Sequence, residues 1–122
     1  MACLQHANVI CIEPEDTNKN LETLSYVWSK LSQEGATRHS LLINVGGGMV
    51  TDLGGFAAAT FKRGITYINI PTTLLAMIDA SVGGKTGINF NGLKNEIGAF
   101  APAAVVLLCG KFLQTLDQRN LL

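Results

Sequence analysis

Hydrophobic and polar positions follow one another along this chain in blocks that predict strands and helices in alternation. Four short apolar runs occupy residues 9–12, 41–45, 65–70 and 104–108. Apolar runs of this length without polar alternation are typical of strands in a parallel sheet, because such strands are covered on both faces. We therefore expect four strands, and we expect the strand at 41–45 to be buried on both faces.

The segment before Gly35 has the spacing of an amphipathic helix. Apolar side chains recur there every three or four positions, at Leu21, Leu24, Val27, Trp28 and Leu31. This spacing and the glycine that follows it predict a helix over about residues 20–34. Within that helix, Tyr26 and Trp28 are expected to serve packing rather than ligand binding.

Two further helices are predicted after the second and third strands. The small residues of 49–61 suit a helix packed closely on a sheet, and Thr72 and Thr73 can cap a short helix that reaches residue 78. Residues 81–100 predict a long glycine-rich loop that can contain a small hairpin. Asp117 is a candidate start of another helix.

The alternation of strands and helices predicts an α/β fold. A Rossmann-like parallel sheet with flanking helices accommodates this order of elements. No strand–helix unit precedes the first apolar run, and the sequence stops where a further helix would begin. We therefore expect a piece of such a fold, truncated at both ends.

Composition excludes several classes of function. The 122 residues are 48% hydrophobic and 15% charged, and their formal net charge is zero. Balanced charge argues against a basic nucleic-acid-binding arm, and the apolar runs are shorter than the ~18 residues of a membrane span. The first residues lack a signal-peptide pattern. Cys3, Cys11 and Cys109 form no CxxC pair, so neither a disulfide framework nor a cysteine zinc site is predicted. We expect a soluble, cytoplasmic domain.

Glycines and charges mark the middle of the chain as the place for chemistry. Eleven of the 13 glycines lie between Gly46 and Gly98, and residues 40–110 hold only seven charged side chains. Glycine lets backbone N–H groups come close to a ligand. A few charges in an apolar, glycine-rich stretch are therefore candidates for a binding site.

The turn formed by Gly46, Gly47 and Gly48 lies between a predicted strand and a predicted helix. Backbone N–H groups at such a helix start can hold a pyrophosphate. The run matches neither GxGxxG nor a P-loop, and a tight packing turn is the alternative. Asp52 strengthens the ligand interpretation, because a carboxylate among apolar residues needs a partner. A hydroxyl on a ribose or a group beside a nicotinamide would serve, and the alternative is a charge on the helix dipole.

Two threonines and several charges follow along the chain. Thr72 and Thr73 come directly after a strand, at the edge where α/β sheets bind ligands, and helix capping is compatible with that role. Asp79, Lys85 and Lys94 lie in or beside the glycine-rich loop and predict an anion site with an acceptor for hydroxyls. Lys62 and Arg63 are predicted at a helix end.

The two histidines predict no metal centre. His6 and His39 lie in segments poor in glycine, and no carboxylate is placed at metal-ligand spacing from either of them. Both are expected at the surface.

Three ordered motifs resemble one enzyme family. The segments GGGMVTDLGGFAAATFKRG, INIPTTLLAMIDASVGGKTGIN and LKNEIGAF are similar to those of the 3-dehydroquinate synthases, over about residues 14–115. The resemblance implies a partial NAD-binding domain over residues 1–122. It also implies a metal-binding helical domain outside this chain, which would bind zinc or cobalt. The implied activity is the NAD-dependent conversion of 3-deoxy-D-arabino-heptulosonate 7-phosphate to 3-dehydroquinate and phosphate in the shikimate pathway.

The resemblance also implies roles for particular residues. Arg63 matches an arginine that reaches the substrate phosphate of a neighbouring subunit, which implies a homodimer. The implied catalytic residues are Arg63, Asp79, Lys85, Lys94 and Asn95. The implied cofactor-binding residues are Pro14, Glu15, Asp16, Thr17, Asn18, Lys19, Gly47, Gly48, Met49, Val50, Thr51, Asp52, Thr72, Thr73, Lys85, Lys94, Phe112, Leu113, Gln114 and Thr115.

Three other functions remain open at this point. A related sugar-phosphate cyclase of the inosose or valiolone synthase type would share these motifs. A metal-dependent polyol dehydrogenase also uses a GGGxxxD-like turn, but SVGGKTG together with LKNEIGAF favours a cyclase. The third alternative is a nucleotide-binding module without turnover, and we expect the 122-residue chain by itself to be inactive, because metal ligands are not predicted within it.

Overall fold

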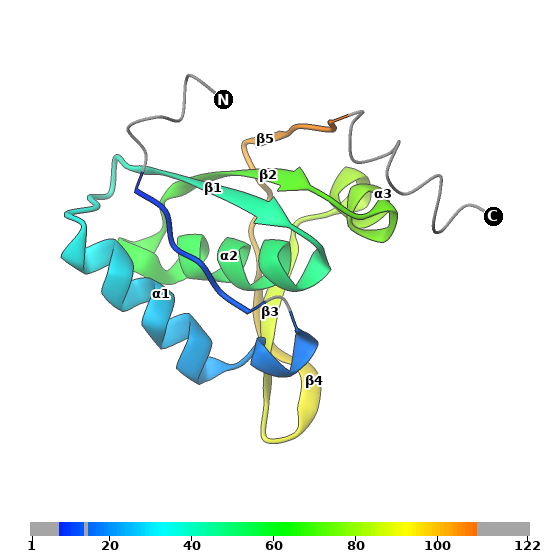
Figure 1. Cartoon of the computed structure of the whole chain (residues 1–122), viewed down its shortest axis with the longest axis horizontal. Coiled ribbons are helices and arrows are strands. Elements are labelled where there is room, and N and C mark those ends of the chain that lie inside the picture. The colour runs from blue at the N-terminus through cyan, green and yellow to red at the C-terminus, as the bar shows by residue number, and fades with distance from the viewer. Residues whose placement is uncertain (1–7, 14, 110–122) are drawn as a thin grey trace.

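Three parallel strands form a small sheet along one side of the structure. The computed structural model describes residues 8–13 and 15–109 (Figure 1). The sheet has the order β1-β2-β5, with β1 at Leu41–Gly46, β2 at Thr66–Pro71 and β5 at Val105–Val106. Residues Leu41 to Gly46 pair in register with Thr66 to Pro71. The predicted α/β fold with a parallel sheet is therefore confirmed, although β5 is shorter than expected.

Helix α1, Leu21–Gln33, begins and ends where the sequence indicates. The Asn20 side chain accepts a hydrogen bond from the Thr23 amide at 2.9 Å, as an N-cap residue does. Leu24, Val27 and Leu31 are its buried residues. Trp28 packs partly buried against the core, and its indole N–H donates to the Thr60 hydroxyl at 3.1 Å. The predicted packing role of Trp28 is thus confirmed.

Helices α2 and α3 follow strands β1 and β2. Helix α2, Gly48–Thr60, is built largely of small and apolar residues, most of them buried. Helix α3 spans Leu74–Val82, and the Thr73 hydroxyl caps it by accepting the Ala76 amide at 3.1 Å. Two single-turn 3-10 helices, η2 at Asp16–Asn18 and η3 at Phe61–Arg63, precede α1 and follow α2.

The segment predicted as a long loop is mostly an antiparallel hairpin. Its strands are β3, Lys85–Phe90, and β4, Leu93–Phe100. Asn91 and Gly92 connect them, both at positive φ, and such a pair favours a tight hairpin turn. At Gly98, a Cβ atom would lie 2.1 Å from the Thr86 carbonyl oxygen. Glycine is therefore needed there to let the two strands approach. The expected hairpin is confirmed, whereas the expectation that most of the segment is loop is wrong.

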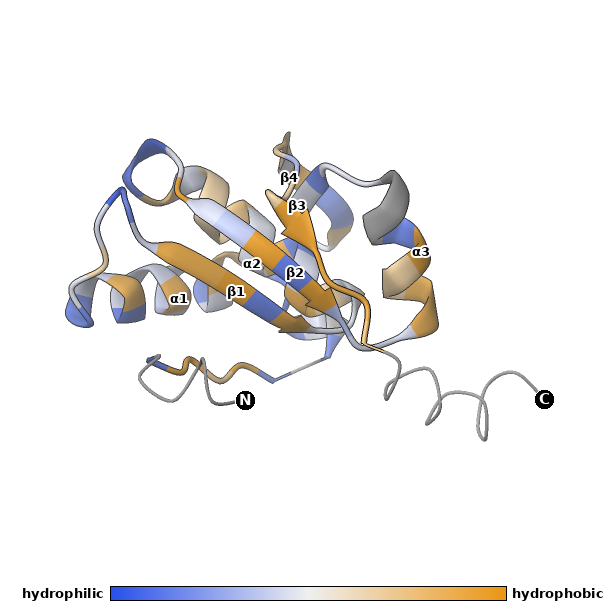
Figure 2. Ribbon diagram, turned by 90° about the horizontal axis from the view of Figure 1, so that it is seen from above, coloured by the Kyte–Doolittle hydropathy of each residue, from blue (hydrophilic) through white to orange (hydrophobic). Residues whose placement is uncertain are grey.

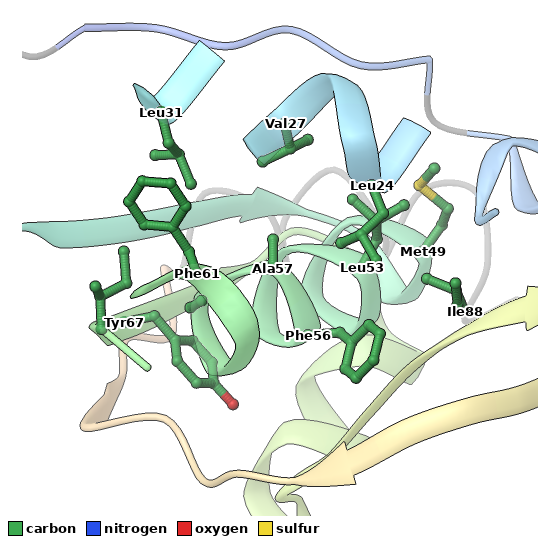
Figure 3. Close-up of a cluster of buried hydrophobic side chains, with 12 residues drawn as sticks. Leu24, Val27, Leu31, Met49, Leu53, Phe56, Ala57, Phe61, Tyr67 and Ile88 are labelled. Atoms are coloured by element: carbon green, nitrogen blue, oxygen red, sulfur yellow. The ribbon is translucent and has the colours of Figure 1, made fainter. Parts of the chain in front are cut away.

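Helix α2 lies between the sheet and a second layer. Figure 1 shows α1 and the β3–β4 hairpin on the side of α2 away from β1 and β2. The core fills the spaces around α2, and Figure 3 shows Leu24 and Val27 of α1 against Leu53 and Ala57 of α2. Ile88 joins this cluster from the hairpin. Burying the apolar surface of α2 on several sides is what holds these elements together.

The opposite face of the sheet is open. Leu41 and Val45 of β1 are each 50% exposed, whereas Asn44, which points toward α2, is buried. Figure 2 views the sheet from this open side, with α1 and α2 behind it. The prediction that residues 41–45 are buried on both faces is therefore wrong, because α2 packs against one face of β1 while Leu41 and Val45 on the other face stay half exposed.

Residues 9–12 do not form a strand. The segment runs extended, with Val9 80% exposed and Ile10 and Ile12 partly buried against the core. None of the strands in the described ranges pairs with this segment. Its apolar residues Ile10 and Ile12 serve packing against the core instead.

Candidate functional site

The glycine turn and the paired threonines meet at the carboxyl edge of the sheet. The Thr72 amide donates to the Gly46 carbonyl at 2.8 Å. A Cβ atom on Gly47 would lie 3.2 Å from the Thr73 methyl group, while one on Gly48 would meet nothing within 4 Å. The ends of β1 and β2 therefore form one surface, and Gly48 leaves space in front of the first turn of α2.

The first turn of α2 offers backbone rather than side-chain donors. Its N-cap residue is Gly47, which makes no side-chain capping bond. The Met49 and Thr51 side chains are buried, and the Thr51 hydroxyl donates to the Gly47 and Gly48 carbonyls at 3.3 and 3.2 Å. The donors that this turn offers to a ligand are therefore the main-chain N–H groups before Thr51, because the Thr51 N–H itself donates to the Gly47 carbonyl at 3.1 Å. A helix start of this kind favours an anion such as a pyrophosphate.

Three predicted site residues from distant parts of the chain form one polar cluster. The Lys19 ammonium group donates to Asp52 Oδ2 at 3.2 Å and to Asn95 Oδ1 at 2.7 Å. Lys19 is 4% exposed, so its charge needs these partners. The sequence indicated that the Asp52 carboxylate needs a partner. Within the chain that partner is the Lys19 ammonium group, so Asp52 does not depend on a ligand for its pairing. The Asp52 side chain is 38% exposed, which leaves part of it accessible.

A polar cavity of about 180 Å³ lies where α2, α3 and β3 meet. Asp52, Asp79 and Lys85 all line it, so the fold gathers three predicted residues that are spread over 33 positions of the sequence. The remaining lining residues are Thr51, Tyr67, Asn69, Gly83, Gly84, Thr86, Pro102, Ala103 and Val106. One ammonium group and two carboxylates in one cavity suit a ligand that carries both an anionic group and hydroxyls.

Tyr67 is a site residue that the sequence reasoning missed. It lies on β2, lines the cavity, and donates its hydroxyl to the Ala101 carbonyl. Burial raises the pKa of the Tyr67 phenol above its ordinary value, and the nearby Asp52 carboxylate adds to this effect. The phenol is therefore a neutral donor over a wide pH range.

The signal that could have identified Tyr67 is the period of two along β2. Tyr67 and Asn69 share the face that points toward α2, and the Asn44 amide donates to Asn69 Oδ1 at 3.1 Å. Polar side chains on the helix-facing side of two adjacent strands are unusual in a core, because they need partners there.

Other predicted residues lie away from the cavity. Arg63 is exposed in η3, after the last turn of α2, and thus at the opposite end of that helix from the glycine turn. Lys94 is exposed on β4 and does not line the cavity. Glu15 and Thr17 are exposed, and Asn18 is partly buried. Of Asp16 only the backbone, in η2, is described. Pro14, Phe112, Leu113, Gln114, Thr115, His6, Cys3 and Asp117 lie outside the described residues.

The described residues offer neither a cluster of metal ligands nor a membrane-spanning helix. Among residues 8–13 and 15–109, no three His, Cys, Asp or Glu side chains are grouped so that they could hold a metal ion. His39 is exposed and its ring nitrogen accepts from Arg38 at 3.3 Å. Within the same ranges, no helix has the length and apolar character that crossing a bilayer requires.

Comparison with known proteins points to one family. Residues 9–122 match the family model described as the 3-dehydroquinate synthase N-terminal domain. The chain is 60% identical over 118 residues to the 3-dehydroquinate synthase of Parabacteroides distasonis, covering 97% of this chain and 33% of that protein. It therefore spans about a third of the length of the curated relatives that it matches.

Two solved structures are similar to this chain. One is 2-epi-5-epi-valiolone synthase from Streptomyces hygroscopicus with NAD+ and Zn2+ bound, with a TM-score of 0.83 and 40% identity over 90% of this chain and 31% of that chain. The other is 2-deoxy-scyllo-inosose synthase complexed with carbaglucose-6-phosphate, NAD+ and Co2+. Its TM-score is 0.82, with 28% identity over 86% of this chain and 29% of that chain.

Proposed function

The chain belongs to the 3-dehydroquinate synthase family, and from that premise we propose that it is part of the NAD-binding half of an enzyme that makes 3-dehydroquinate. The enzyme would convert 3-deoxy-D-arabino-heptulosonate 7-phosphate to 3-dehydroquinate and inorganic phosphate. The observation that carries the proposal is the meeting of the glycine turn with Thr72 and Thr73 beside a cavity lined by Asp52, Asp79 and Lys85.

The residues at the sheet edge fit NAD. The space in front of Gly48 and the main-chain N–H groups of the first turn of α2 suit the pyrophosphate. Thr73 uses its oxygen to cap α3, and its O–H remains a donor for the cofactor. The Asp52 side chain is partly exposed and forms an ion pair with Lys19, and it can still accept a hydrogen bond from a ribose hydroxyl or an amide. When bound, NAD supplies a reversible acceptor for hydride from a substrate carbon.

The charged cavity fits the sugar phosphate. Lys85 would offset the charge of the phosphate or of an oxygen that becomes negative, and Asp79 would accept hydrogen bonds from hydroxyls. We assign Lys94 and Asn95 to the same substrate region. The reaction releases phosphate by elimination, in which a C–H proton leaves and the C–O bond to phosphate breaks, so a phosphate site beside hydroxyl acceptors is what it requires.

The rest of the proposal concerns parts outside this site. We assign the divalent metal, zinc or cobalt, to a helical domain not contained in these 122 residues. Arg63, at the far end of α2 from the cavity, would reach the phosphate in a second subunit of a homodimer. We also propose that the enzyme is cytoplasmic. The 122-residue chain alone would bind without turnover.

A second candidate is a related sugar-phosphate cyclase of the valiolone or inosose synthase type. The TM-scores of 0.83 and 0.82 to two such enzymes favour it, since the described residues superpose well on both. It would use the same cofactor surface and a different sugar phosphate.

Calorimetric titration with NAD+ tests the cofactor assignment, on the 122-residue chain and on the full-length protein. We expect the full-length protein to bind. No binding by either protein would contradict the NAD-dependent function, and binding by the full-length protein alone would show that flanking segments complete the site. Phosphate release from 3-deoxy-D-arabino-heptulosonate 7-phosphate, compared with release from sedoheptulose 7-phosphate and glucose 6-phosphate, then separates the two candidates. Phosphate release by the 122-residue chain would contradict its proposed inactivity.

A further inference from the structure

Asn89 on β3 connects two residues of the polar cluster. Its main-chain N–H donates to the Lys19 carbonyl at 2.7 Å. Its side-chain Oδ1 accepts the main-chain N–H of Asn95 at 2.9 Å. Asn89 therefore holds the backbone of Lys19 and the backbone of Asn95 at once, while the Asn95 side chain in turn accepts from the Lys19 ammonium group at 2.7 Å.

Asn95 needs such support because its backbone is in an uncommon conformation. Its φ is 52°, in the left-handed region, although it lies inside β4. The register of the hairpin is irregular between Ile88 and Phe90, the stretch that contains Asn89. A non-glycine residue at positive φ costs about 1 kcal/mol or more unless its surroundings hold it there. The hydrogen bond from Asn95 to Asn89 supplies that hold within the hairpin.

We propose that Asn89 is a positioning residue of this site. It keeps Asn95 in the left-handed conformation, so that the Asn95 amide oxygen faces Lys19 and fixes the ammonium group that pairs with Asp52. Asn89 does not line the cavity, so it acts through Asn95 and Lys19 rather than on a ligand. The consequence for catalysis rests on the proposed function, whereas the conformational role does not.

Two substitutions in the full-length protein separate the hydrogen bond from the side-chain shape. Asn89→Ala removes the acceptor, and Asn89→Asp keeps an oxygen acceptor at the same place. We expect Asn89→Ala to weaken NAD+ binding and to lower kcat/KM by about tenfold, and Asn89→Asp to stay within about threefold of the wild type. Leu93→Ala, at an exposed residue of the same hairpin, is the control and should change neither quantity. Equal losses in Asn89→Ala and Leu93→Ala would overturn the proposal.

A double-mutant cycle tests whether Asn89 acts through Asn95. Glycine tolerates positive φ without help, so Asn95→Gly removes the need for the support. The effect of Asn89→Ala on NAD+ affinity should therefore fall from about tenfold to about twofold or less in the Asn95→Gly background. An undiminished effect in that background would overturn the proposal.

Hydrogen exchange without any ligand gives a readout independent of the proposed function. Peptides containing residue 95 should lose amide protection in Asn89→Ala and keep it in Asn89→Asp, while Leu93→Ala should leave it unchanged. Unaltered protection in Asn89→Ala would overturn the positioning role. If the wild-type protein fails to bind NAD+ but shows this exchange pattern, the proposed function fails and the positioning of Asn95 stands.

Discussion

Lys19 and Asp52, 33 positions apart, form an ion pair with an Nζ–Oδ2 distance of 3.2 Å, and the lysine is almost wholly buried. The pair joins the segment before α1 to the second turn of α2. Lys19 belongs to the predicted cofactor-binding residues 14–19, and Asp52 lies on the helix that follows the glycine turn. The Lys19 ammonium group also donates to Asn95 of the hairpin.

Asp52→Asn should destabilise the protein, because it removes the carboxylate at 3.2 Å from the buried Lys19 ammonium group. We expect a loss of about 1–2 kcal/mol in the free energy of unfolding, below the value for a fully buried pair, because Asp52 is partly exposed. Urea denaturation measures it. The double variant Lys19→Met with Asp52→Asn should regain part of the loss, since no charge remains buried. A double variant no more stable than Asp52→Asn alone would contradict this account.

Gly54→Ala should be strongly destabilising, because the new Cβ atom would lie 2.0 Å from Asn44 Oδ1. Asn44 is buried and bonded to Asn69, so it cannot move aside freely. We expect a loss of about 1–3 kcal/mol, measured by thermal or urea unfolding.

Gly48→Ala is the matched control on the same helix. Its Cβ atom would meet nothing within 4 Å, so stability should stay within about 1 kcal/mol of the wild type. Affinity for NAD+ should nevertheless fall by about tenfold, since the methyl group would occupy space that a pyrophosphate needs. Unchanged affinity would argue against the pyrophosphate lying at this turn.

Tyr67 predicts a loss of stability at alkaline pH. Its pKa is raised above 10.0 in the folded protein, mainly by burial, so the unfolded chain releases the proton first as pH rises. The stability that the neutral Tyr67 phenol contributes to the folded state is fully present below pH 10.0 and declines above it. In urea denaturation between about pH 8 and 11, the unfolding free energy of the wild type should fall more steeply than that of Tyr67→Phe. Parallel curves would show that another group is responsible.

Lys85→Ala should impair the full-length enzyme far more than Lys62→Ala. Lys85 lines the cavity, whereas Lys62 is exposed in η3. Both substitutions keep a Cβ atom, so the left-handed backbone of Lys62 is not altered further. We expect kcat/KM to fall by at least about a hundredfold for Lys85→Ala and by less than about threefold for Lys62→Ala. Similar kinetics in the two variants would contradict the role of Lys85.

Local sequence patterns predicted where helices and strands lie better than they predicted what packs against them. The spacing of apolar residues and Gly35 located α1, and the capping residue Thr73 located α3, because capping depends on neighbours in sequence. The hairpin is longer than expected, because the glycines of residues 81–100 indicated a loop over most of the segment, although Asn91–Gly92 is itself a hairpin-turn signal. The exposure of Leu41 and Val45 could not be predicted, since apolar residues do not specify what covers them.

The candidate site was predictable as a set of residues but not as a geometry. Glycine content and sparse charges indicated Asp52, Asp79 and Lys85, which the cavity brings together. The pairing of Lys19 with Asp52 depends on a contact between distant segments, which no spacing rule contains. Tyr67 was not predicted as a site residue, because it lies on β2, whose sequence pattern is typical of a buried strand.

Helix α3 carries Asp79 of the cavity and is capped by Thr73 of the sheet edge, so both residues depend on whether this helix is folded. The Thr73 hydroxyl oxygen stabilises its first turn, and Asp79 of its second half lines the cavity. A ligand that takes up the Thr73 O–H and reaches Asp79 would bind only while the helix is wound. By thermodynamic linkage, occupancy would then suppress fraying of α3, and substitutions that loosen this helix would weaken affinity without touching the ligand.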